Sequence, residues 1–336
     1  MRVALIASGD GPNARYRVFG PAEALVARGH RVFASVFADM KEPNALLDFD
    51  VVLGWRMHDE FFTRLARGMG ERRIGLVWDN DDNFLAIESG ANKQSAFFRT
   101  LRGRRMLADM RTLMGLANVV TTPSAGLAAH YREQVETDVR VIENCVAPIA
   151  PRLTPAKPQR VVVGWVANKE HQADVERLGL GAAMERLLER HPHVEVATIG
   201  CSLGIASDRY HYIRGVEFAE LRGYLRQFDI GLAPIADTPF NRSRSNVKVK
   251  EYAALGVPWL ASPTGPYAQL GQDEGGRLVP DDRWFEETER LVLDHKARRK
   301  LAKRAVKWSA RQTFEANVHL WEETLREAAA RAGRRV

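Results

Sequence analysis

Short apolar stretches alternate with longer amphipathic segments along the chain, which is the pattern of a parallel sheet covered by helices. In the first half, the apolar stretches predict strands at 2–7, 31–36, 50–53, 74–78, 119–122 and 139–142. Segments with helical spacing predict helices between them at 13–28, 58–67, 96–117 and 124–133. The first half therefore predicts one complete doubly wound domain.

The same alternation restarts after a proline-rich stretch at 147–159, which is expected to be an extended linker. Strands are then predicted at 161–166, 194–199, 210–213, 230–233, 259–261 and 277–279, and helices at 171–190, 217–227 and 246–255. The sequence therefore predicts an α/β chain of two Rossmann-like domains. Their parallel sheets are expected to face a cleft, because ligands of open α/β folds bind at the carboxyl ends of the strands.

Composition agrees with this organisation. The 336 residues suit two domains, and a hydrophobic content of 45% is ordinary for a globular protein. No apolar run is long enough for a signal peptide or a membrane span, so a cytoplasmic protein is expected. Cys145 and Cys201 are too few for a disulfide framework. The net charge of +7 favours anionic partners, namely sugar nucleotides, acidic lipid surfaces or nucleic acid.

The most informative stretch is 245–262. It begins with residues that cap helices, Ser245 and Asn246, and it carries Lys248 and Glu251 three positions apart on one helical face. A polar helix start with a carboxylate one turn further on suits a nucleoside diphosphate. The alternative is that Lys248 and Lys250 form a solvated helix face, as most helical lysines do.

The run Glu-Tyr-Ala-Ala-Leu-Gly-Val-Pro at 251–258 resembles the GT-B fold glycosyltransferases, specifically the large retaining family numbered four. The resemblance implies that Glu251 holds the ribose hydroxyls of the donor. The family usually has a second Glu eight positions earlier, and this chain has Ser243 there. The runs 241–246 and 265–267 are similar to those of a bacterial surface-polysaccharide subset.

The resemblance also gives each domain a role. It implies an acceptor domain at 1–148, a linker at 149–160, a nucleotide-sugar donor domain at 161–310, and a carboxyl-terminal helix within 311–336 that crosses back to the first domain.

A leaving diphosphate gains charge, and without a metal ion that charge is stabilised by cations and helix N-termini. Lys248 and Arg244 are the candidate cations of the helix start, together with backbone groups near Ser245, Asn246 and Val247.

A second candidate for the diphosphate is the turn after the strand 161–166, where Asn168 and Lys169 are placed to meet phosphate. In similar sequences a basic residue of this loop binds the diphosphate, and Lys169 matches it. His171 is also assigned to this site, since it shares a helical face with Asp174. The alternative is a helix cap with a surface pair.

Asp79, Asn80, Asp81 and Asp82 follow the fourth predicted strand. Such carboxylates can bind Mg²⁺ or Mn²⁺, or one of them can act as a base toward an acceptor hydroxyl. The Asp-x-Asp spacing is that of a metal motif in another glycosyltransferase fold, which the two-domain layout contradicts, so no metal is expected. The resemblance implies that Asp79 or Asp81 orients the acceptor, and Arg56 is a further candidate. The alternative for any one Asp is a helix N-cap.

Gly9 and Gly11 belong to a Gly-x-Gly-x-x-Ala run after the first strand. Pro12 removes an amide that a dinucleotide would need, and no acid follows at the expected spacing. The resemblance implies instead that the backbone of this turn approaches the donor. It also implies that Arg15 or Arg17 contacts the acceptor or the diphosphate. The alternative is a basic first turn packed on the surface.

Two segments are strongly basic, at 99–111 and 296–307. The first is amphipathic, as expected of a helix that rests on anionic lipid, whereas the second is expected to be a solvated helix. Aromatic platforms and nucleic-acid-binding modules are missing from the sequence, so nucleic acid is not an expected partner. Peripheral contact with the inner face of a membrane stays open.

Together with these observations, the resemblance implies a glycosyltransferase (EC 2.4) that moves a sugar from a UDP- or GDP-sugar to an acceptor hydroxyl. The acceptor would be a glycan, a lipid-linked molecule or a small molecule. Retention at the anomeric carbon is implied by the resemblance, and no cofactor beyond the donor is expected. Two alternatives remain, a catalytically lapsed GT-B module that binds a nucleotide or glycan, and an NAD-dependent enzyme.

Overall fold

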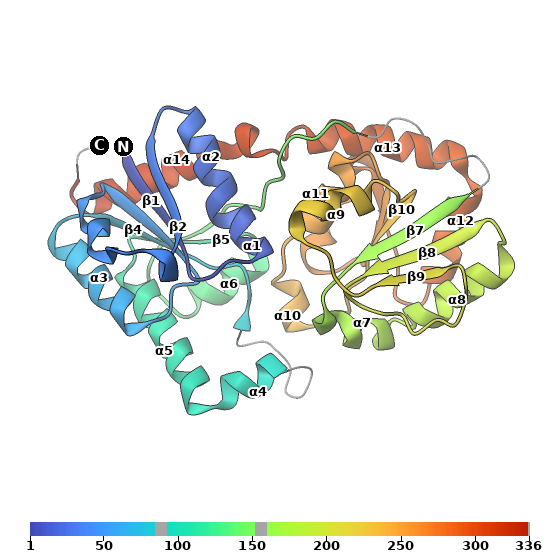
Figure 1. Cartoon of the computed structure of the whole chain (residues 1–336), viewed down its shortest axis with the longest axis horizontal. Coiled ribbons are helices and arrows are strands. Elements are labelled where there is room, and N and C mark those ends of the chain that lie inside the picture. Colours follow the sequence, from blue (N-terminus) through green and yellow to red (C-terminus); the bar gives the residue numbers. More distant parts are fainter. Residues whose placement is uncertain (85–92, 152–159, 335–336) are drawn as a thin grey trace. The chain divides into compact units, whose positions relative to one another are not determined.

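The computed structural model describes residues 1–84, 93–151 and 160–334, and it divides into two compact units (Figure 1). Unit 1 contains Met1–Ala147, Ser243–Ser245 and Thr313–Val336. Unit 2 contains Pro148–Arg242 and Asn246–Gln312. Residues 152–159 of the expected linker lie outside the described residues.

Unit 1 is built on a six-stranded parallel sheet in the order β2-β1-β3-β4-β5-β6. Its strands are β1 (Arg2–Ala7), β2 (Arg31–Val36), β3 (Val51–Trp55), β4 (Gly75–Asp79), β5 (Val119–Thr122) and β6 (Val139–Val141). Every residue of β3 and β4 is buried, as expected for central strands that are covered on both faces.

The helices of unit 1 are α1 (Pro12–Ala14), α2 (Gly20–Ala27), α3 (Glu60–Glu71), α4 (Lys93–Arg99), α5 (Leu101–Leu116), α6 (Ala125–Arg132) and α14 (Phe314–Arg331). A π-helical turn, Arg15–Phe19, separates α1 from α2. Short 3-10 turns follow β2 at Phe37–Asp39 and Pro43–Asp48.

The prediction of a single helix at 96–117 is wrong, because the helix is interrupted at Thr100. The Thr100 hydroxyl accepts a hydrogen bond from the Gly103 amide at 3.1 Å, so Thr100 caps α5 as a new helix. Gly103 permits the tight turn, since a Cβ there would collide with the backbone of Phe97.

The last helix, α14, belongs to unit 1 and packs on β3, β4 and α2 (Figure 1). At the closest approach Gly75 faces the helix backbone, where a Cβ would lie 2.6 Å from the amide nitrogen of Ala329. Trp321 is 1% exposed, and the Phe314 ring lies directly against Gly20. The core of unit 1 therefore includes residues from both ends of the chain.

Unit 2 contains a second six-stranded parallel sheet in the order β12-β11-β10-β7-β8-β9. Its strands are β7 (Val161–Val166), β8 (Val194–Ile199), β9 (Tyr210–Ile213), β10 (Ile230–Ala233), β11 (Trp259–Ala261) and β12 (Gly276–Leu278). Its helices are α7 (Gln172–Arg177), α8 (Leu180–Arg190), α9 (Phe218–Leu225), α10 (Pro239–Arg242), α11 (Val247–Ala254), α12 (Trp284–Leu293) and α13 (His295–Ser309).

Two details of unit 2 differ from the expectation. The helix expected at 171–190 is divided, because Gly179 adopts a left-handed φ of +57° between α7 and α8. The helix α12 was not expected, although it buries Trp284, Phe285, Leu291 and Val292 on one face. The prediction of an α/β chain with two Rossmann-like domains is confirmed. Within the described ranges, no helix combines the length and apolar character needed to cross a bilayer.

Candidate functional site

In both units the candidate residues lie where parallel strands end at their carboxyl side, which is the usual ligand edge of such sheets. In unit 1 the acidic turn 79–82 follows β4, and in unit 2 the turn 168–171 follows β7. We describe the two edges separately.

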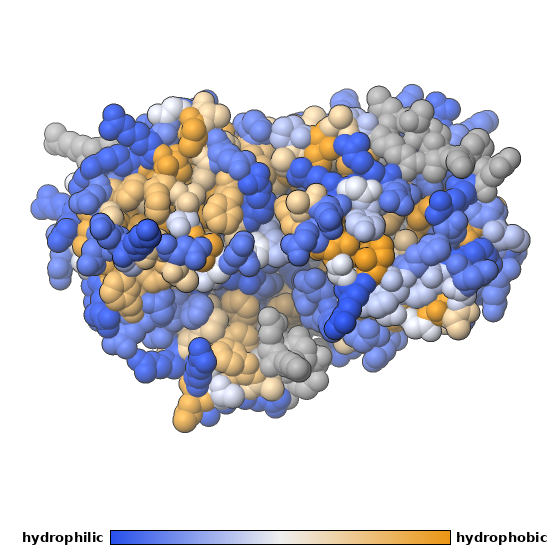
Figure 2. Space-filling view, viewed as in Figure 1, coloured by the Kyte–Doolittle hydropathy of each residue, from blue (hydrophilic) through white to orange (hydrophobic). Residues whose placement is uncertain are grey.

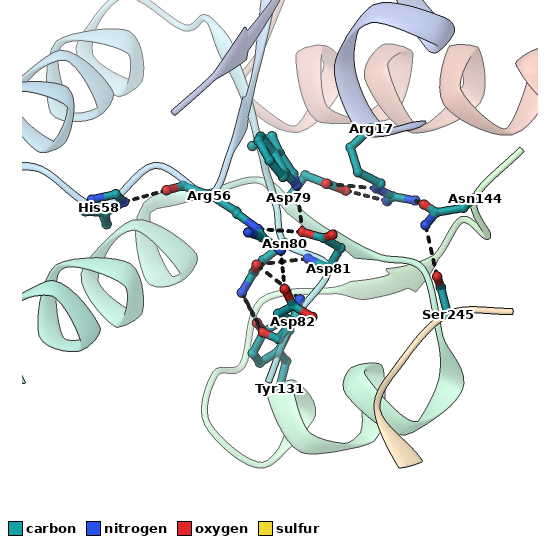
Figure 3. Close-up of polar contacts among 11 residues, drawn as sticks. Arg17, Arg56, His58, Asp79, Asn80, Asp81, Asp82, Tyr131, Asn144 and Ser245 are labelled. Carbon is teal, nitrogen blue, oxygen red and sulfur yellow. Dashed lines mark hydrogen bonds and ion pairs between the residues drawn. The ribbon is translucent and has the colours of Figure 1, made fainter. Parts of the chain in front are cut away.

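Asp79 is the last residue of β4, and its carboxylate is completely buried. Arg17 donates to both of its oxygens, from Nε at 3.0 Å and from Nη2 at 2.5 Å (Figure 3). The Thr121 hydroxyl donates to Oδ2 at 2.5 Å. Three donors therefore occupy the Asp79 carboxylate, which makes it part of the interior and not of the exposed edge.

Arg17 reaches Asp79 from the π-helical turn, and its side chain has no exposed surface. Its Nη1 donates to the carbonyl of Ile142 and to Oδ1 of Asn144. Its guanidinium stacks on the Trp321 ring, 4.7 Å from the ring centre. The expectation that Arg17 touches a ligand is wrong, because burial and these partners fix it inside unit 1.

Arg15, the other candidate in this turn, lies at the surface and forms an ion pair with Glu23 at 2.6 Å. Gly9 and Gly11 border open space, where an added Cβ would meet no described atom within 4 Å. Packing within the described part of the chain therefore does not account for glycine at either position.

Asp81 and Asp82 both contact Arg56, which follows β3 (Figure 3). The Arg56 Nε lies 2.6 Å from Asp81 Oδ1, and the same oxygen accepts from Trp55 Nε1 at 2.9 Å. Burial raises the pKa of Asp81, and the Arg56 charge opposes this rise. Burial also opposes the charge on Arg56, but Asp81 and Asp82 outweigh it and raise the pKa of Arg56.

The backbone of Arg56 adopts a positive φ of 55°, which is uncommon for a residue with a side chain. Its amide donates to the Asp79 carbonyl at 2.8 Å, and its guanidinium lies over the rings of Trp55 and Phe84. These contacts, together with the two carboxylates, hold the Arg56 guanidinium in place as a fixed charge.

Asn80 fixes the shape of the acidic turn. Its Oδ1 accepts from the Asp81 amide at 2.9 Å, and its Nδ2 donates to the Tyr131 hydroxyl (Figure 3). Tyr131 is 5% exposed, and burial raises its pKa, so it stays protonated. Beside these two residues lies a small pocket of about 20 Å³, which is room for a water molecule, and Trp78, Phe84 and Met110 also line it.

Ser243 stands where the resembling family has a second Glu, and it is 4% exposed. Its hydroxyl accepts from Asn83 Nδ2 at 3.2 Å, and its carbonyl accepts from the Ser124 hydroxyl at 2.6 Å. The Ser245 hydroxyl accepts from Asn144 Nδ2 at 3.1 Å. Ser243, the half-buried Arg244 and Ser245 therefore group with unit 1, whereas the other expected donor residues of this segment group with unit 2.

In unit 2, the Lys248 ammonium donates to the carbonyl of Val166, the last residue of β7. This contact brings α11 next to the turn that holds Asn168 and Lys169, both of which are exposed. The solvated-face alternative for α11 is wrong, because Lys250 is 1% exposed and Lys248 is half-buried. The contact spans 82 residues of sequence and joins two segments that were each assigned to the donor.

Glu251 lies one turn into α11 and is 5% exposed. Asn246 is the N-cap residue of α11, and its side chain makes no capping hydrogen bond to the helix; Val247 is the half-buried first residue. The start of α11 is thus polar and half-buried, and backbone amides at a helix start favour an anion.

His171 and Asp174 form a buried pair and not a surface pair, with Nδ1 and Oδ2 2.7 Å apart. The other oxygen of Asp174 accepts from the Ala236 amide at 3.0 Å and from Asn241 Nδ2 at 2.8 Å. Burial alone would raise the pKa of Asp174, but the His171 bond and these donors lower it. The carboxylate therefore orients the His171 ring and joins the segments that follow β7 and β10.

No group of three His, Cys, Asp or Glu side chains converges as metal ligands within residues 1–84, 93–151 and 160–334.

Comparisons with known proteins give likenesses in structure alone. The sequence matches no protein-family model and no curated protein. Sucrose-phosphate synthase from Thermosynechococcus elongatus is similar with a TM-score of 0.71 at 17% identity, over 98% of this chain and 99% of that one. HepE from Anabaena, in a complex with UDP, is similar with a TM-score of 0.68 at 15% identity, over 97% and 99% of the two chains. The chain has the GT-B fold.

A third structural neighbour is a putative UDP-N-acetylglucosamine 2-epimerase from Listeria monocytogenes, with a TM-score of 0.59 at 12% identity over 96% of this chain and 95% of that one. The fold therefore does not by itself decide the reaction.

Sequence reasoning missed several residues of these two edges. The sequence pattern gives no separate role to Asn80 of the acidic turn, and it does not indicate Tyr131, Asn144 or Asn241. Each of them forms hydrogen bonds with residues that are distant in sequence. Asn80 and Tyr131, for example, are 51 residues apart. The assignment of the candidate residues to a donor and an acceptor stays a prediction.

Proposed function

We propose that this protein is a glycosyltransferase that moves a sugar from a nucleoside-diphosphate sugar to an acceptor hydroxyl. The observation that carries the proposal is the contact between Lys248 and the Val166 carbonyl, because it joins the start of α11 to the turn after β7. A helix start, two lysines and a buried carboxylate then lie on one edge of unit 2. This combination suits a diphosphate attached to a ribose.

Within this proposal each residue has a distinct task. Glu251 accepts hydrogen bonds from the ribose hydroxyls, as the resemblance implies. Lys248 and Lys169 offset the charge that develops on the leaving diphosphate, together with the first amides of α11. His171, which is held by Asp174, lies three residues beyond Asn168 and supports the same turn.

For the acceptor we propose Asp81 and not Asp79. The Asp79 carboxylate is occupied by Arg17 and Thr121, so it acts as a positioning residue for the turn. Asp81 is paired with Arg56 in a fixed geometry, and its raised pKa makes it a better hydrogen-bond acceptor for a sugar hydroxyl.

Two further points belong to the proposal. We expect the transfer to proceed without a required metal, since the acidic turn is paired with the guanidinium groups of Arg17 and Arg56. We expect retention at the anomeric carbon on the strength of the resemblance. HepE is similar in fold and has been solved with UDP and with UDP-glucose, which supports a uridine nucleotide as the first donor to test.

A thermal-shift panel of UDP, GDP, their sugar conjugates and NADH tests the donor class. We expect a uridine or guanosine nucleotide to raise the melting temperature, and Glu251→Ala to abolish the rise. The matched control is Glu220→Ala, at an exposed carboxylate on α9 of the same unit, which should keep the full shift. A shift with NADH alone, or with no nucleotide at saturation, would contradict the proposal.

Binding alone does not separate a transferase from a lapsed module. Release of free UDP or GDP from the bound sugar nucleotide, measured with a coupled assay, makes that distinction. Slow donor hydrolysis that Lys248→Met reduces supports a transferase. Tight binding with no release of nucleotide in the presence of glycan and lipid acceptors supports the lapsed module.

We also propose that the protein works in the cytoplasm in peripheral contact with anionic membrane through α4 and α5. Leu101 is 81% exposed where the two helices meet, and Arg102, Arg104 and Arg105 beside it are exposed. Sedimentation with phosphatidylglycerol vesicles, but not with phosphatidylcholine vesicles, is expected. The double variant Leu101→Glu, Arg102→Glu should stay in the supernatant, whereas Lys303→Glu on α13 should not change binding. Equal binding to both kinds of vesicle would contradict this contact.

A further inference from the structure

The strand β2 is the outer strand of the unit 1 sheet, and none of its six residues is buried. Its neighbour β1 buries five of six residues. Strands of parallel sheets are normally covered on both faces, so the exposure of β2 is unusual for its apolar sequence, Arg-Val-Phe-Ala-Ser-Val.

Apolar side chains continue on both sides of this strand. Phe33 on β2 is 40% exposed, and Val26 on α2 and Phe61 on α3 are 56% and 39% exposed. The Phe33 ring packs near that of Phe49, with the ring centres 6.1 Å apart, and the Phe61 ring packs near that of Phe37, with the ring centres 6.0 Å apart. Figure 2 shows a broad apolar area over this part of unit 1. Such an area marks an interaction surface.

The outer edge of β2 also presents backbone hydrogen-bonding groups. The Arg31 amide donates inward to the Met1 carbonyl, and the direction alternates along a strand. The amides and carbonyls of Val32, Ala34 and Val36 therefore point away from β1. Edge strands are usually protected from pairing by charged side chains, but β2 has a charge only at its first residue, Arg31.

The corresponding outer strand of unit 2, β9, lies beside a network of charged side chains. On β9, the His211 Nε2 lies 2.9 Å from Glu195 Oε2, and Arg160 pairs with the same carboxylate. Tyr212 on β9 is 42% exposed, which is nearly the exposure of Phe33. The two edges therefore differ in chemistry and not in exposure.

We propose that β2 pairs with β2 of a second copy of this chain, in an antiparallel arrangement around a twofold axis that passes beside Ala34. In this register Val32 of one copy lies opposite Val36 of the other, and the two Ala34 residues face each other. All outward backbone groups of the strand are then paired. The small side chain of Ala34 allows the close approach at the axis, and Phe33 lies opposite Ser35 of the second copy.

Charge favours a second copy over an unrelated strand. Arg31 is exposed at the start of β2, and Asp39 is exposed in the turn that follows its end. An antiparallel twofold arrangement brings Arg31 of each copy toward Asp39 of the other. The surface is thus complementary to itself, as an isologous interface requires.

The mass of the full chain in solution, measured by light scattering during gel filtration at several concentrations, tests this interface. We expect a dimer for the wild type. Ala34→Pro should give a monomer, because proline removes an outward amide and leaves the bonds to β1 in place. Phe33→Lys should also give a monomer, and the matched variant Tyr212→Lys should stay dimeric.

Two measurements keep the test decisive. Circular dichroism and thermal melts must show that both monomeric variants keep their fold. Ala34→Cys should form an intermolecular disulfide on mild oxidation, since the distance across the axis suits a disulfide and the native cysteines are buried. Tyr212→Cys should not form one. A wild type that stays monomeric at about 100 μM, in the range where a weak dimer would still assemble, overturns the proposal. So does a dimer that survives both β2 substitutions.

Discussion

Arg17 and Asp79 form an ion pair in which neither side chain has any exposed surface, and two hydrogen bonds join them. The pair ties the first helical segment of unit 1 to the end of β4, immediately before the acidic turn. Taking two charges out of water costs free energy that only their mutual contacts offset, so each partner depends on the other.

Replacing one member of this pair should therefore leave a buried charge without its counterion. We expect Arg17→Met or Asp79→Asn to lower the free energy of unfolding by about 3–5 kcal/mol, measured by urea denaturation. The control is Glu23→Gln, which removes the exposed partner of Arg15 and should cost less than about 1 kcal/mol. Equal, small effects at both pairs would show that the buried pair contributes little.

Arg56 affects the acidic turn through the pKa of Asp81. Burial raises that pKa and the Arg56 charge holds it down, so Arg56→Gln should raise it further. If ionised Asp81 accepts the acceptor hydroxyl, activity falls when the pH drops below this pKa. We therefore expect the acidic limb of the kcat/KM profile to move to higher pH. Arg64→Gln, at an exposed arginine of α3, should leave the profile unchanged, and an unmoved limb in Arg56→Gln would remove Asp81 from the site.

Lys248 should matter for the diphosphate and not for the nucleoside. A charge-assisted hydrogen bond to phosphate is worth roughly 1.5–3 kcal/mol, so Lys248→Met should lower the affinity for UDP at least about tenfold. The affinity for uridine, measured by the same calorimetric titration, should change much less. Because Lys248 also bonds the Val166 carbonyl, the melting temperature without ligand must be compared as well. An equal loss for UDP and uridine would indicate a purely structural lysine, and Lys303→Met provides the matched control.

Glu322 on α14 should make the stability of unit 1 depend on pH. Hydrogen bonds from Arg326, and then from Arg28 and His30, lower its pKa from 4.5 to about 2, although burial opposes this. A lowered folded-state pKa gives stability that is present above pH 4.5 and is lost as the pH falls toward 2. Since its arginine partners are about half exposed, we expect Glu322→Gln to cost about 1–2 kcal/mol at pH 7.

The difference between Glu322→Gln and the wild type should shrink as unfolding is repeated between pH 5 and pH 2.5, in the window set by the fall in pKa to about 2. Glu315→Gln, at an exposed position near the start of the same helix, should show no such trend. A difference that stays constant over this range would mean that the negative charge of Glu322 is not what stabilises α14.

The strands were predictable because buried parallel strands are continuous apolar runs. The segments 2–7 and 161–166 coincide with β1 and β7, as six other predicted strands coincide with theirs, and only β3, β4, β6 and β12 differ, by one or two residues at their ends. The helix breaks at Thr100 and Gly179 were not predictable from periodicity, which continues through both positions. They depend on a side-chain cap and on a left-handed backbone, respectively.

The site was predictable only in part. Spacing identified Lys248 and the turn after β7, and the structure brings them together. Arg17 could not be assigned correctly, because its partner Asp79 is 62 residues away and a π-helical turn directs the side chain inward. Local sequence carries no signal for a contact of that kind. The same holds for Asn241, whose partner Asp174 is 67 residues away.

The packing of α14 on β3 and β4 has a consequence for synthesis of the chain. The ribosome completes all of unit 2 before it makes the helix that fills the core of unit 1. Until Trp321 and Ala329 emerge, Gly75 and Arg17 lack the surface against which they pack. The amino-terminal unit is therefore the last to reach its native state. Removal of α14 should destabilise this unit, although the deleted residues lie at the other end of the sequence.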